Sequence, residues 1–367
     1  MRDERLAKLA RVLVDYSVEA GDGDQVLLSG ESAAEPLVKE IYTRLLQVGA
    51  TPVPMVALPG MRELFFEHAQ NVHYEKTPPI TRAIFEEADA FFNILAPSNT
   101  RSLANVDPGK QQRLGARDKD IRDLAIQKDR WILTLFPTEA LAQESDMSLA
   151  AYEEFVFGAM ALDKEDPVAF WRKKGEEQAR LIERLEEANE VRIVGPETDL
   201  TLSIAGRKFL NGDGKHNMPC GEVFTGPIED SATGTVHFGI PATAGGRDVA
   251  GARFRFENGK VVEASADKGE EYLNAMLDAD AGARFLGELG IGTNYGIPQA
   301  SKNILFDEKL GGTVHLAIGK SYEKTGGQND SSVHWDLITD LRDGGELYLD
   351  GELIQENGKF LDFDLAG

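Results

Sequence analysis

The first half of the chain alternates between amphipathic helical patterns and short apolar runs. Near the start, apolar residues recur three and four positions apart, as on the buried face of a helix, at Leu6, Leu9, Ala10, Leu13 and Val14. A second such pattern covers 33–50 and closes at Gly49. Short apolar runs bounded by turn residues lie between and after these stretches, at 26–28, 51–58, 88–96 and 130–137. This alternation predicts a mostly parallel sheet that is covered by helices.

The pattern changes near residue 190. Residues 147–188 are rich in charge and predict helix, and we interpret the last part of this stretch as a solvated helix that links two domains. Strand patterns and glycine turns then continue to the C-terminus, interrupted by one predicted helix within 268–290. The expected fold class is α/β, with an N-terminal domain at 1–190 that holds the helix-covered parallel sheet and a C-terminal mixed α+β domain at 191–367.

Composition adds limits to this picture. A chain of 367 residues is long enough for two domains, and its 42% hydrophobic and 28% charged content is ordinary for a globular protein. No apolar run approaches the roughly 20 residues of a membrane helix. Charges in the opening sequence MRDERLAKLARVL occupy the place where a signal peptide needs apolar residues, so we expect a cytoplasmic protein.

The charge and the cysteine count exclude several kinds of site. The formal net charge is -23 and no basic patch stands out, so nucleic acid is not an expected partner. We attribute the acidity to solubility, although it would also attract cationic substrates. Cys220 is the one cysteine, which leaves no intrachain disulfide and no cysteine-based zinc cluster. The two glycine-rich motifs that are typical of nucleotide binding, GxGxxG and GxxxxGK[ST], do not occur. A bound metal would therefore need His, Asp, Glu or Tyr ligands.

Candidate ligands lie on two predicted strands of the second half. His334 and Asp336 are two residues apart, so on a strand their side chains share one face while Trp335 points to the other. His315 alternates with Val314 and Leu316 in the same way and stands opposite their apolar face. An imidazole and a carboxylate side by side form a chelating pair, but an isolated pair of this kind is more typical of a simple hydrogen bond.

Further polar residues lie at strand ends and glycine turns of the same half. Glu222 lies at the start of an apolar strand, and Glu288 at a predicted helix end that runs into glycines. Asp307 and Glu308 precede the strand of His315, and Tyr322 follows it. Each residue alone is more typical of a cap, a turn or a surface charge. Their gathering in one domain indicates a metal site.

Four segments give these residues a family context: GEVFTGP, FLGELGIGTN, ILFDEKLGGTVHLAIGKSY and SSVHWDLI. In order and approximate spacing they resemble the aminopeptidase T-type family of metallo-aminopeptidases, which includes aminopeptidase S. The resemblance is strongest over 219–341. It implies two divalent metal ions in the C-terminal domain, zinc, cobalt or manganese, held by Glu222, Glu288, His315, Tyr322, His334 and Asp336.

The resemblance also implies chemistry and assembly. Glu288 would bridge the two ions, Glu308 would be a further ligand or handle a proton, and Glu288, Glu308 and Tyr322 would form the catalytic group. Short peptides would lose N-terminal residues to a metal-activated water. A homodimer whose active sites face an enclosed interior would limit the substrates. The chain is shorter than typical members, and the segment between Tyr322 and His334 is contracted, which affects specificity.

Two other functions remain open at this point. In a ring-cleaving dioxygenase of the dihydroxypyridine type, which resembles the same fold, His315, His334 and Asp336 would hold one Fe(II) ion. Glu222, Glu288 and Tyr322 would then have no evident function. A non-catalytic member of the family would keep the fold and bind peptides or a protein. The resemblance assigns no function to His216, His237 or Cys220, and we expect His237 and Cys220 to pack.

Overall fold

The computed structural model describes residues 3–244 and 247–365, which form two compact units. The first unit holds the residues up to 169 together with 214–219, and the second holds 170–213 and the residues from 220 onward. The chain therefore returns once from the second unit to the first. The boundary near residue 190 remains a prediction, since the units change over at residue 170, inside a long helix.

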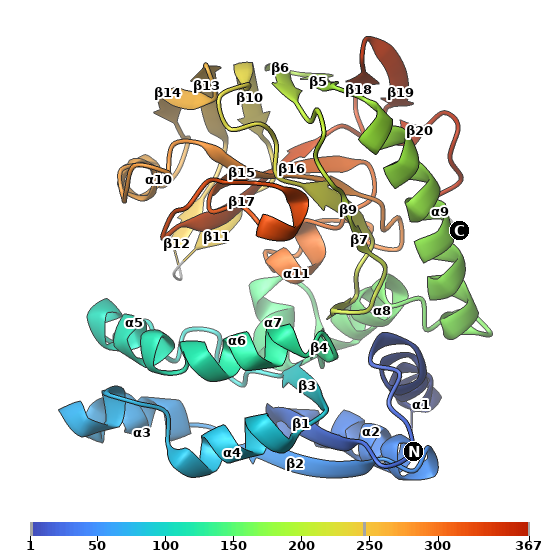
Figure 1. Cartoon of the computed structure of the whole chain (residues 1–367), viewed down its shortest axis with the longest axis vertical. Helices are drawn as coiled ribbons and strands as arrows, with labels where there is room; N and C mark the ends of the chain where they lie inside the picture. The colour runs from blue at the N-terminus through green and yellow to red at the C-terminus, as the bar shows by residue number, and fades with distance from the viewer. Residues whose placement is uncertain (1–2, 245–246, 366–367) are drawn as a thin grey trace. The chain divides into compact units, whose positions relative to one another are not determined.

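The first unit is built on a parallel sheet, as the alternation of helices and strands predicted (Figure 1). The strand order is β2-β1-β3-β4-β8, and every pairing in it is parallel. The four apolar runs of the first half supply four of these strands, and the returning segment supplies the fifth. Their bounds are β1 Gln25–Glu31, β2 Thr51–Ala57, β3 Ala90–Leu95, β4 Trp131–Leu135 and β8 Asn217–Met218.

Helices connect these strands and begin at residues whose side chains accept backbone N–H groups. Asp3, Asp107, Thr138 and Ser148 cap four of them in this way. The helices are α1 Glu4–Arg11, α2 Glu35–Gln47, α3 Met61–His68, α4 Pro79–Glu87, α5 Pro108–Arg117, α6 Lys119–Gln127, α7 Glu139–Glu144 and α8 Leu149–Ala159. One π-helical turn continues α1 at Val12–Ser17, and short 3₁₀ turns lie at Ser32–Ala34 and Asn71–Tyr74.

The second unit consists mainly of antiparallel sheets. An eight-stranded sheet has the order β14-β13-β10-β6-β5-β18-β19-β20, a five-stranded sheet has the order β17-β16-β15-β9-β7, and β11 pairs with β12. The bounds are β5 Glu190–Gly195, β6 Thr198–Ser203, β7 Leu210–Gly212, β9 Glu222–Thr225, β10 Thr233–Phe238, β11 Ala242–Ala244, β12 Arg247–Val249, β13 Ala252–Glu257, β14 Lys260–Ser265, β15 Leu286–Gly292, β16 Thr313–Gly319, β17 His334–Asp340, β18 Glu346–Leu349, β19 Glu352–Glu356 and β20 Lys359–Phe360. The mixed α+β domain expected from the sequence is therefore present.

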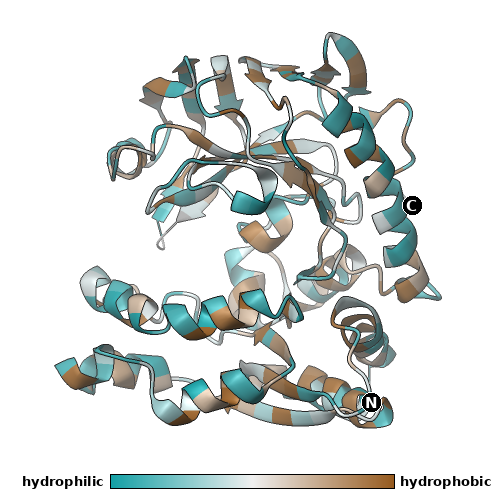
Figure 2. Ribbon diagram, viewed as in Figure 1, coloured by the Kyte–Doolittle hydropathy of each residue, from teal (hydrophilic) through white to brown (hydrophobic). Residues whose placement is uncertain are grey.

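Helices of the second unit are few among the described residues. They are α9 Pro167–Glu187, α10 Glu270–Leu277, α11 Ile304–Asp307 and a 3₁₀ turn at Glu323–Thr325. Brown and teal segments alternate along α9 in Figure 2, and its Leu181 and Leu185 are fully buried in the core of this unit. This helix therefore packs on the second unit with one face, which the interpretation as a solvated linker did not anticipate.

One apolar core joins the two large sheets of the second unit. Alternate residues of β16, such as Val314 and Leu316, lie in this core together with Trp335 and Leu337 of β17. His315, His334 and Asp336 therefore belong to the opposite face of the five-stranded sheet, as the alternation predicted. None of the described helices combines the length and the apolar character that a membrane-spanning segment needs.

The prediction of helix up to residue 290 was wrong in its second part. Helix α10 ends at Leu277, and Leu286–Gly292 is the strand β15, fully buried along its length. The sequence LGELGIG lacks β-branched residues except Ile291, so its propensity for strand is weak. Pairing on both sides, to β16 and β9, outweighs that weak propensity.

Candidate metal centre

Four neighbouring strands carry the candidate ligands on the face of the five-stranded sheet that lies opposite the shared core. Glu222 begins β9, Glu288 lies in β15, and His315 lies in β16. β17 contributes the other two, His334 and Asp336. The strand register brings them together, because Gly292 pairs with Glu222, Gly290 with His315 and Ala317 with Asp336. Side chains from four strands thus converge without any loop having to place them.

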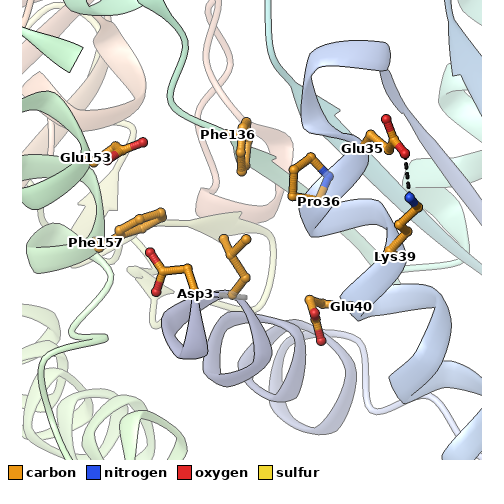
Figure 3. Close-up of a pocket in the computed structure, with 9 residues that line it drawn as sticks. Asp3, Glu35, Pro36, Lys39, Glu40, Phe136, Glu153 and Phe157 are labelled. Carbon is orange, nitrogen blue, oxygen red and sulfur yellow. Dashed lines mark hydrogen bonds and ion pairs between the residues drawn. The ribbon is translucent and has the colours of Figure 1, made fainter. Parts of the chain in front are cut away.

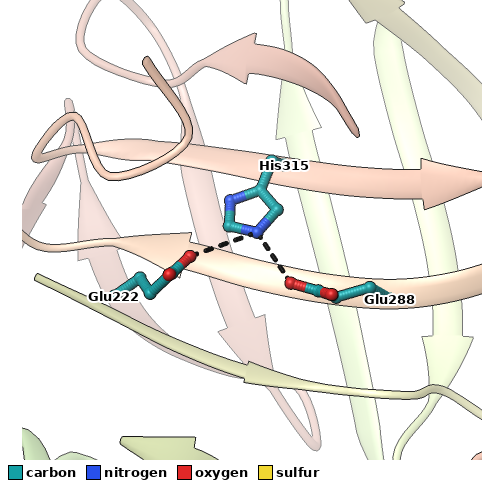
Figure 4. Close-up of side chains that lie close together, drawn as sticks. All are labelled: Glu222, Glu288 and His315. Carbon is teal, nitrogen blue, oxygen red and sulfur yellow. Dashed lines mark hydrogen bonds and ion pairs between the residues drawn. The ribbon is translucent and has the colours of Figure 1, made fainter. Parts of the chain in front are cut away.

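Glu222, Glu288 and His315 form the first donor group (Figure 4). Nε2 of His315 lies 3.0 Å from Oε1 of Glu288 and 3.5 Å from Oε2 of Glu222. All three side chains are buried, and one ligand atom from each lies within 4.8 Å of the others. Buried carboxylates beside an imidazole are a suitable donor set for a divalent ion such as zinc or manganese.

Glu288, His334 and Asp336 form the second donor group. Nε2 of His334 lies 3.6 Å from Oε2 of Glu288 and 3.8 Å from Oδ2 of Asp336. Glu288 therefore belongs to both groups and turns a different oxygen toward each histidine. This is the arrangement that a carboxylate bridging two ions requires.

Both histidines are oriented by backbone carbonyl groups. Nδ1 of His315 donates to the carbonyl oxygen of Glu308 at 2.9 Å, and Nδ1 of His334 donates to that of Lys320 at 2.8 Å. These bonds occupy the proton on Nδ1 and direct each Nε2 toward the carboxylates, where a metal ion could replace the proton of Nε2. A histidine held in this orientation is ready to coordinate a metal, which is why the donor set fits the ions that the resemblance implies.

The glycines of β15 make room for this arrangement. A Cβ atom on Gly290 would lie 1.9 Å from Nε2 of His315, and one on Gly287 would lie 2.3 Å from the carbonyl oxygen of Lys320. Any side chain at Gly290 would occupy the space of the imidazole. The glycines of β15 made this strand hard to recognise in the sequence. The site requires these same glycines, because larger side chains would not fit.

The centre holds more negative charge than its own cations neutralise. Burial raises the pKa of Glu222 to about 7, with Lys309 acting against that rise. Burial and the charges of Glu308 and Glu288 raise the pKa of Asp336 to about 6. Burial would lower the pKa of His315, but the hydrogen bond that its Nε2 donates to Glu288, together with the nearby carboxylates, raises that pKa to about 10. Burial is the main cause of the two carboxylate shifts and neighbouring carboxylates add to it, so divalent cations would stabilise the charged forms of these groups.

Glu308 and Tyr322 lie at the edge of the two groups. Glu308 follows α11, and its charge raises the pKa values of Glu222 and Asp336. The ring of Tyr322 lies 5.3 Å from that of His334, between centroids. Tyr322 is 47% exposed, but burial on its inner side, and then the charge of Glu288, raise the pKa of this phenol. The structure thus places all seven residues predicted for the site close together.

The remaining candidates have other partners. Oδ1 of Asp307 accepts bonds from the backbone and the hydroxyl of Ser301, which makes it a structural residue. His216 lies in the first unit, beside Asp129 and Trp131. His237 lies 3.9 Å from Glu197, and Cys220 is buried. These last three residues belong to neither donor group.

Sequence analysis missed four contributors to the centre. Lys309 is fully buried beside Glu222 and Glu308, although a lysine in a loop gives no signal of burial. Two backbone carbonyl groups orient the histidines, and a carbonyl has no sequence signature. Gln178 of α9, also fully buried, donates to the carbonyl oxygen of Glu222 at 2.9 Å.

A separate pocket of about 640 Å³ lies within the first unit (Figure 3). Phe136, Phe157 and Pro36 line it together with several carboxylates. Glu35 is paired with Lys39, as the dashed line in Figure 3 marks. Among the described residues, the groups with the spacing of metal ligands belong to the second unit and not to this pocket.

Comparison with known proteins places the chain in a family. The family model described as thermophilic metalloprotease (M29) matches residues 2–360. Aminopeptidase 2 from Geobacillus stearothermophilus is 29% identical, and the alignment covers 97% of this chain and 95% of that protein. The alignment spans 405 positions, so the relative has segments that this chain lacks. This agrees with the expectation that the chain is short for its family.

Solved structures confirm the fold. Wild-type AmpT from Thermus thermophilus is similar with a TM-score of 0.84 and 23% identity, over 98% of this chain and 99% of that one. The 2,5-dihydroxypyridine dioxygenase from Pseudomonas putida is similar with a TM-score of 0.58 and 13% identity, over 99% and 98%. The second likeness concerns the fold alone and confirms that both kinds of enzyme share it. The match over nearly its whole length shows that this chain belongs to the thermophilic metalloprotease family M29.

Proposed function

We propose that this protein is a metal-dependent aminopeptidase that hydrolyses the N-terminal residues of short peptides. The observation that carries the proposal is Glu288, which turns one oxygen to each of two donor groups. The names of the relatives, which are aminopeptidases, support it. Two divalent ions bound there would activate a water molecule and polarise the carbonyl of the scissile bond.

In this proposal each residue of the centre is either a metal ligand or a proton-transfer group, according to its position. Glu222 and His315 would hold one ion, His334 and Asp336 would hold the other together with Tyr322, and Glu288 would be shared by both. Glu308 would accept and release the proton of the activated water, because its carboxylate lies near both donor groups and belongs to neither. A free N-terminal amine would be drawn to the carboxylate-rich side of the centre. This attraction would account for a preference for unblocked peptides.

The number of carboxylates favours two ions over one. A single Fe(II) ion needs two histidines and one carboxylate. Here the described donor groups contain Glu222 and Glu288 in addition to Asp336. An iron dioxygenase would leave Glu222 with only the ammonium group of Lys309, and Glu288 with only the two histidines that already serve the iron. Burial of carboxylates with so little compensating charge is costly. With no thiolate ligand among the donors, zinc, cobalt and manganese all suit the site.

Assembly as a homodimer is the expectation from the family resemblance, as is a cytoplasmic location. The edge strand β2, helix α3 and the segment that joins them support the dimer, because they expose apolar side chains: Val53, Met55, Val56, Leu58, Met61 and Leu64. Such a patch is typical of a contact surface. Analytical ultracentrifugation of the wild type and of M55E should show a dimer that the variant weakens, and a wild-type monomer would contradict the proposal.

The experiment for the function combines elemental analysis with an activity assay. Protein purified without chelator or metal-affinity resin should hold close to two zinc, cobalt or manganese ions per chain and cleave aminoacyl-anilides. E288Q should lose both metal and activity, whereas E323Q, at an exposed position of the same unit, should keep both. One iron per chain would favour the dioxygenase. No metal uptake, even on titration, would favour the non-catalytic function.

A further inference from the structure

Lys309 is a charged residue with no exposed surface at the metal centre. Its Nζ lies 3.6 Å from Oε1 of Glu222 and forms an ion pair with Glu308. Its side chain is 0% exposed. Burial of an ammonium group is costly unless carboxylates surround it, so its position depends on these two partners.

The backbone leaves this ammonium group little freedom. The N–H group of Lys309 donates to the carbonyl oxygen of Phe306 at 3.0 Å, and its own carbonyl accepts from Asn294 at 2.9 Å. The turn also lies directly against β15, since a Cβ atom on Gly292 would lie 2.2 Å from the carbonyl oxygen of Leu310. The lysine is therefore anchored on both sides of its side chain.

The two carboxylate oxygens of Glu222 face different partners, and Lys309 is one of them. Oε1 faces the ammonium group at 3.6 Å, and Oε2 faces Nε2 of His315 at 3.5 Å. One oxygen is thus occupied by a fixed cation, and the other is presented to the first donor group. Among the described residues, the ion pairs of Lys309 join it to Glu222 and Glu308, and none joins it to Asp336.

We propose that Lys309 is a positioning residue for the first of the two metal positions. It holds Glu222 so that only Oε2 reaches the ion, and it keeps Glu308 beside the centre. The second position, formed by Glu288, His334 and Asp336, does not depend on it. This inference rests on the proposed function, because it assumes that both donor groups bind ions.

The test measures metal binding to K309M by elemental analysis and by titration of the metal-free protein. Wild type should bind two ions. K309M should bind the second ion normally and the first about 10- to 100-fold more weakly, the usual effect of losing a group that orients a ligand. K174M is the matched control, since Lys174 is also buried in this unit but donates to the backbone carbonyls of Thr293 and Leu365. It should bind two ions.

The outcomes separate this inference from the proposed function. Two ions bound equally well by wild type and K309M would overturn the inference alone. No ion bound by wild type would overturn the proposed function and the inference with it. If K309M does not fold, K309Q replaces it in the same titration, because glutamine keeps a donor for Glu222 and lacks the charge. Unchanged binding of the first ion by K309Q would then show that the charge is not needed.

Discussion

At the scale of single residues, the two histidines of the centre differ in burial. The side chain of His315 is 1% exposed, whereas that of His334 is 29% exposed. Both donate Nδ1 to a backbone carbonyl and both face Glu288. His315 is therefore part of the packed interior, and His334 stands at the side of the centre that solvent reaches.

This difference in burial predicts that H334A changes metal binding and activity much more than it changes the stability of the metal-free protein. Because His334 is partly exposed, its removal should cost the metal-free protein less than about 1 kcal/mol of unfolding free energy, as for an ordinary surface substitution. It should nevertheless lower the metal content to about one ion per chain and abolish hydrolysis. Denaturant unfolding of the metal-free protein, paired with elemental analysis, measures both. Full activity in H334A would contradict its assignment as a ligand.

Sequence analysis arrived at its candidate site residues by two different routes. Alternation along β16 and β17 correctly assigned His315, His334 and Asp336 to the face opposite the core. Glu222 and Glu288 were singled out by their positions at a strand start and beside glycines, and the family resemblance then implied that they are ligands. Lys309 was missed because a lysine next to a glycine turn is ordinarily solvated, and only the fold surrounds it with carboxylates.

At the scale of elements, β15 matters because it lies between the strands that carry the other ligands. Its neighbours are β16 and β9, and its glycines let the imidazole of His315 and the turn after Lys309 lie against it. Glycine lowers the strand propensity of β15, but it allows neighbouring groups to approach the backbone of this strand closely. The misassigned helix end at Glu288 arose from this same composition.

G290A tests the need for that close approach. Its new methyl group would overlap the ring of His315, so His315 must move or the strand must shift. We expect a loss of about 1–3 kcal/mol of stability, the usual cost of overpacking, and a weaker first metal position. Thermal unfolding and metal titration measure the two effects. G115A, in a helix with open space around it, should instead gain about 1 kcal/mol. Unchanged metal binding in G290A would be inconsistent with the geometry described.

Helix α9 carries a second buried lysine whose titration affects stability. Burial lowers the pKa of Lys174 from 10.5 to about 7. Between these two values the unfolded chain holds a proton that the folded chain has released, so stability rises with pH across that window. The stability of wild type relative to K174M should therefore increase by up to about 1.4 kcal/mol per pH unit above pH 7. Urea unfolding at pH 7, 8 and 9 measures it, and a constant difference would mean that Lys174 stays protonated.

At the scale of the whole molecule, the charge balance links metal to stability. The chain carries a formal net charge of -23, and several of its buried carboxylates meet at one centre. Ions that bind the folded chain alone stabilise it by mass action, by about 2.7 kcal/mol for each site at a hundredfold excess over the dissociation constant.

Removal of metal should therefore lower the melting temperature by several degrees. For each ion lost, the unfolding free energy should fall by about the 2.7 kcal/mol given above. Calorimetry with and without a chelator measures it. The E288Q variant is the control, because a protein that cannot hold the ions should not respond to the chelator. Equal melting temperatures for wild type in both conditions would argue against metal binding at this centre.

The sequence alone determined the elements whose side chains repeat with a clear period. Helix–strand alternation predicted the parallel sheet of the first unit, and period-two alternation predicted the faces of β16 and β17. These features depend on local geometry, which each segment encodes by itself. The tertiary structure decided the strand character of β15, the return of β8 to the first sheet, and the burial of Lys309. Those features depend on partners far away in the chain, and pairing, close approach and loss of solvent arise only when those partners meet.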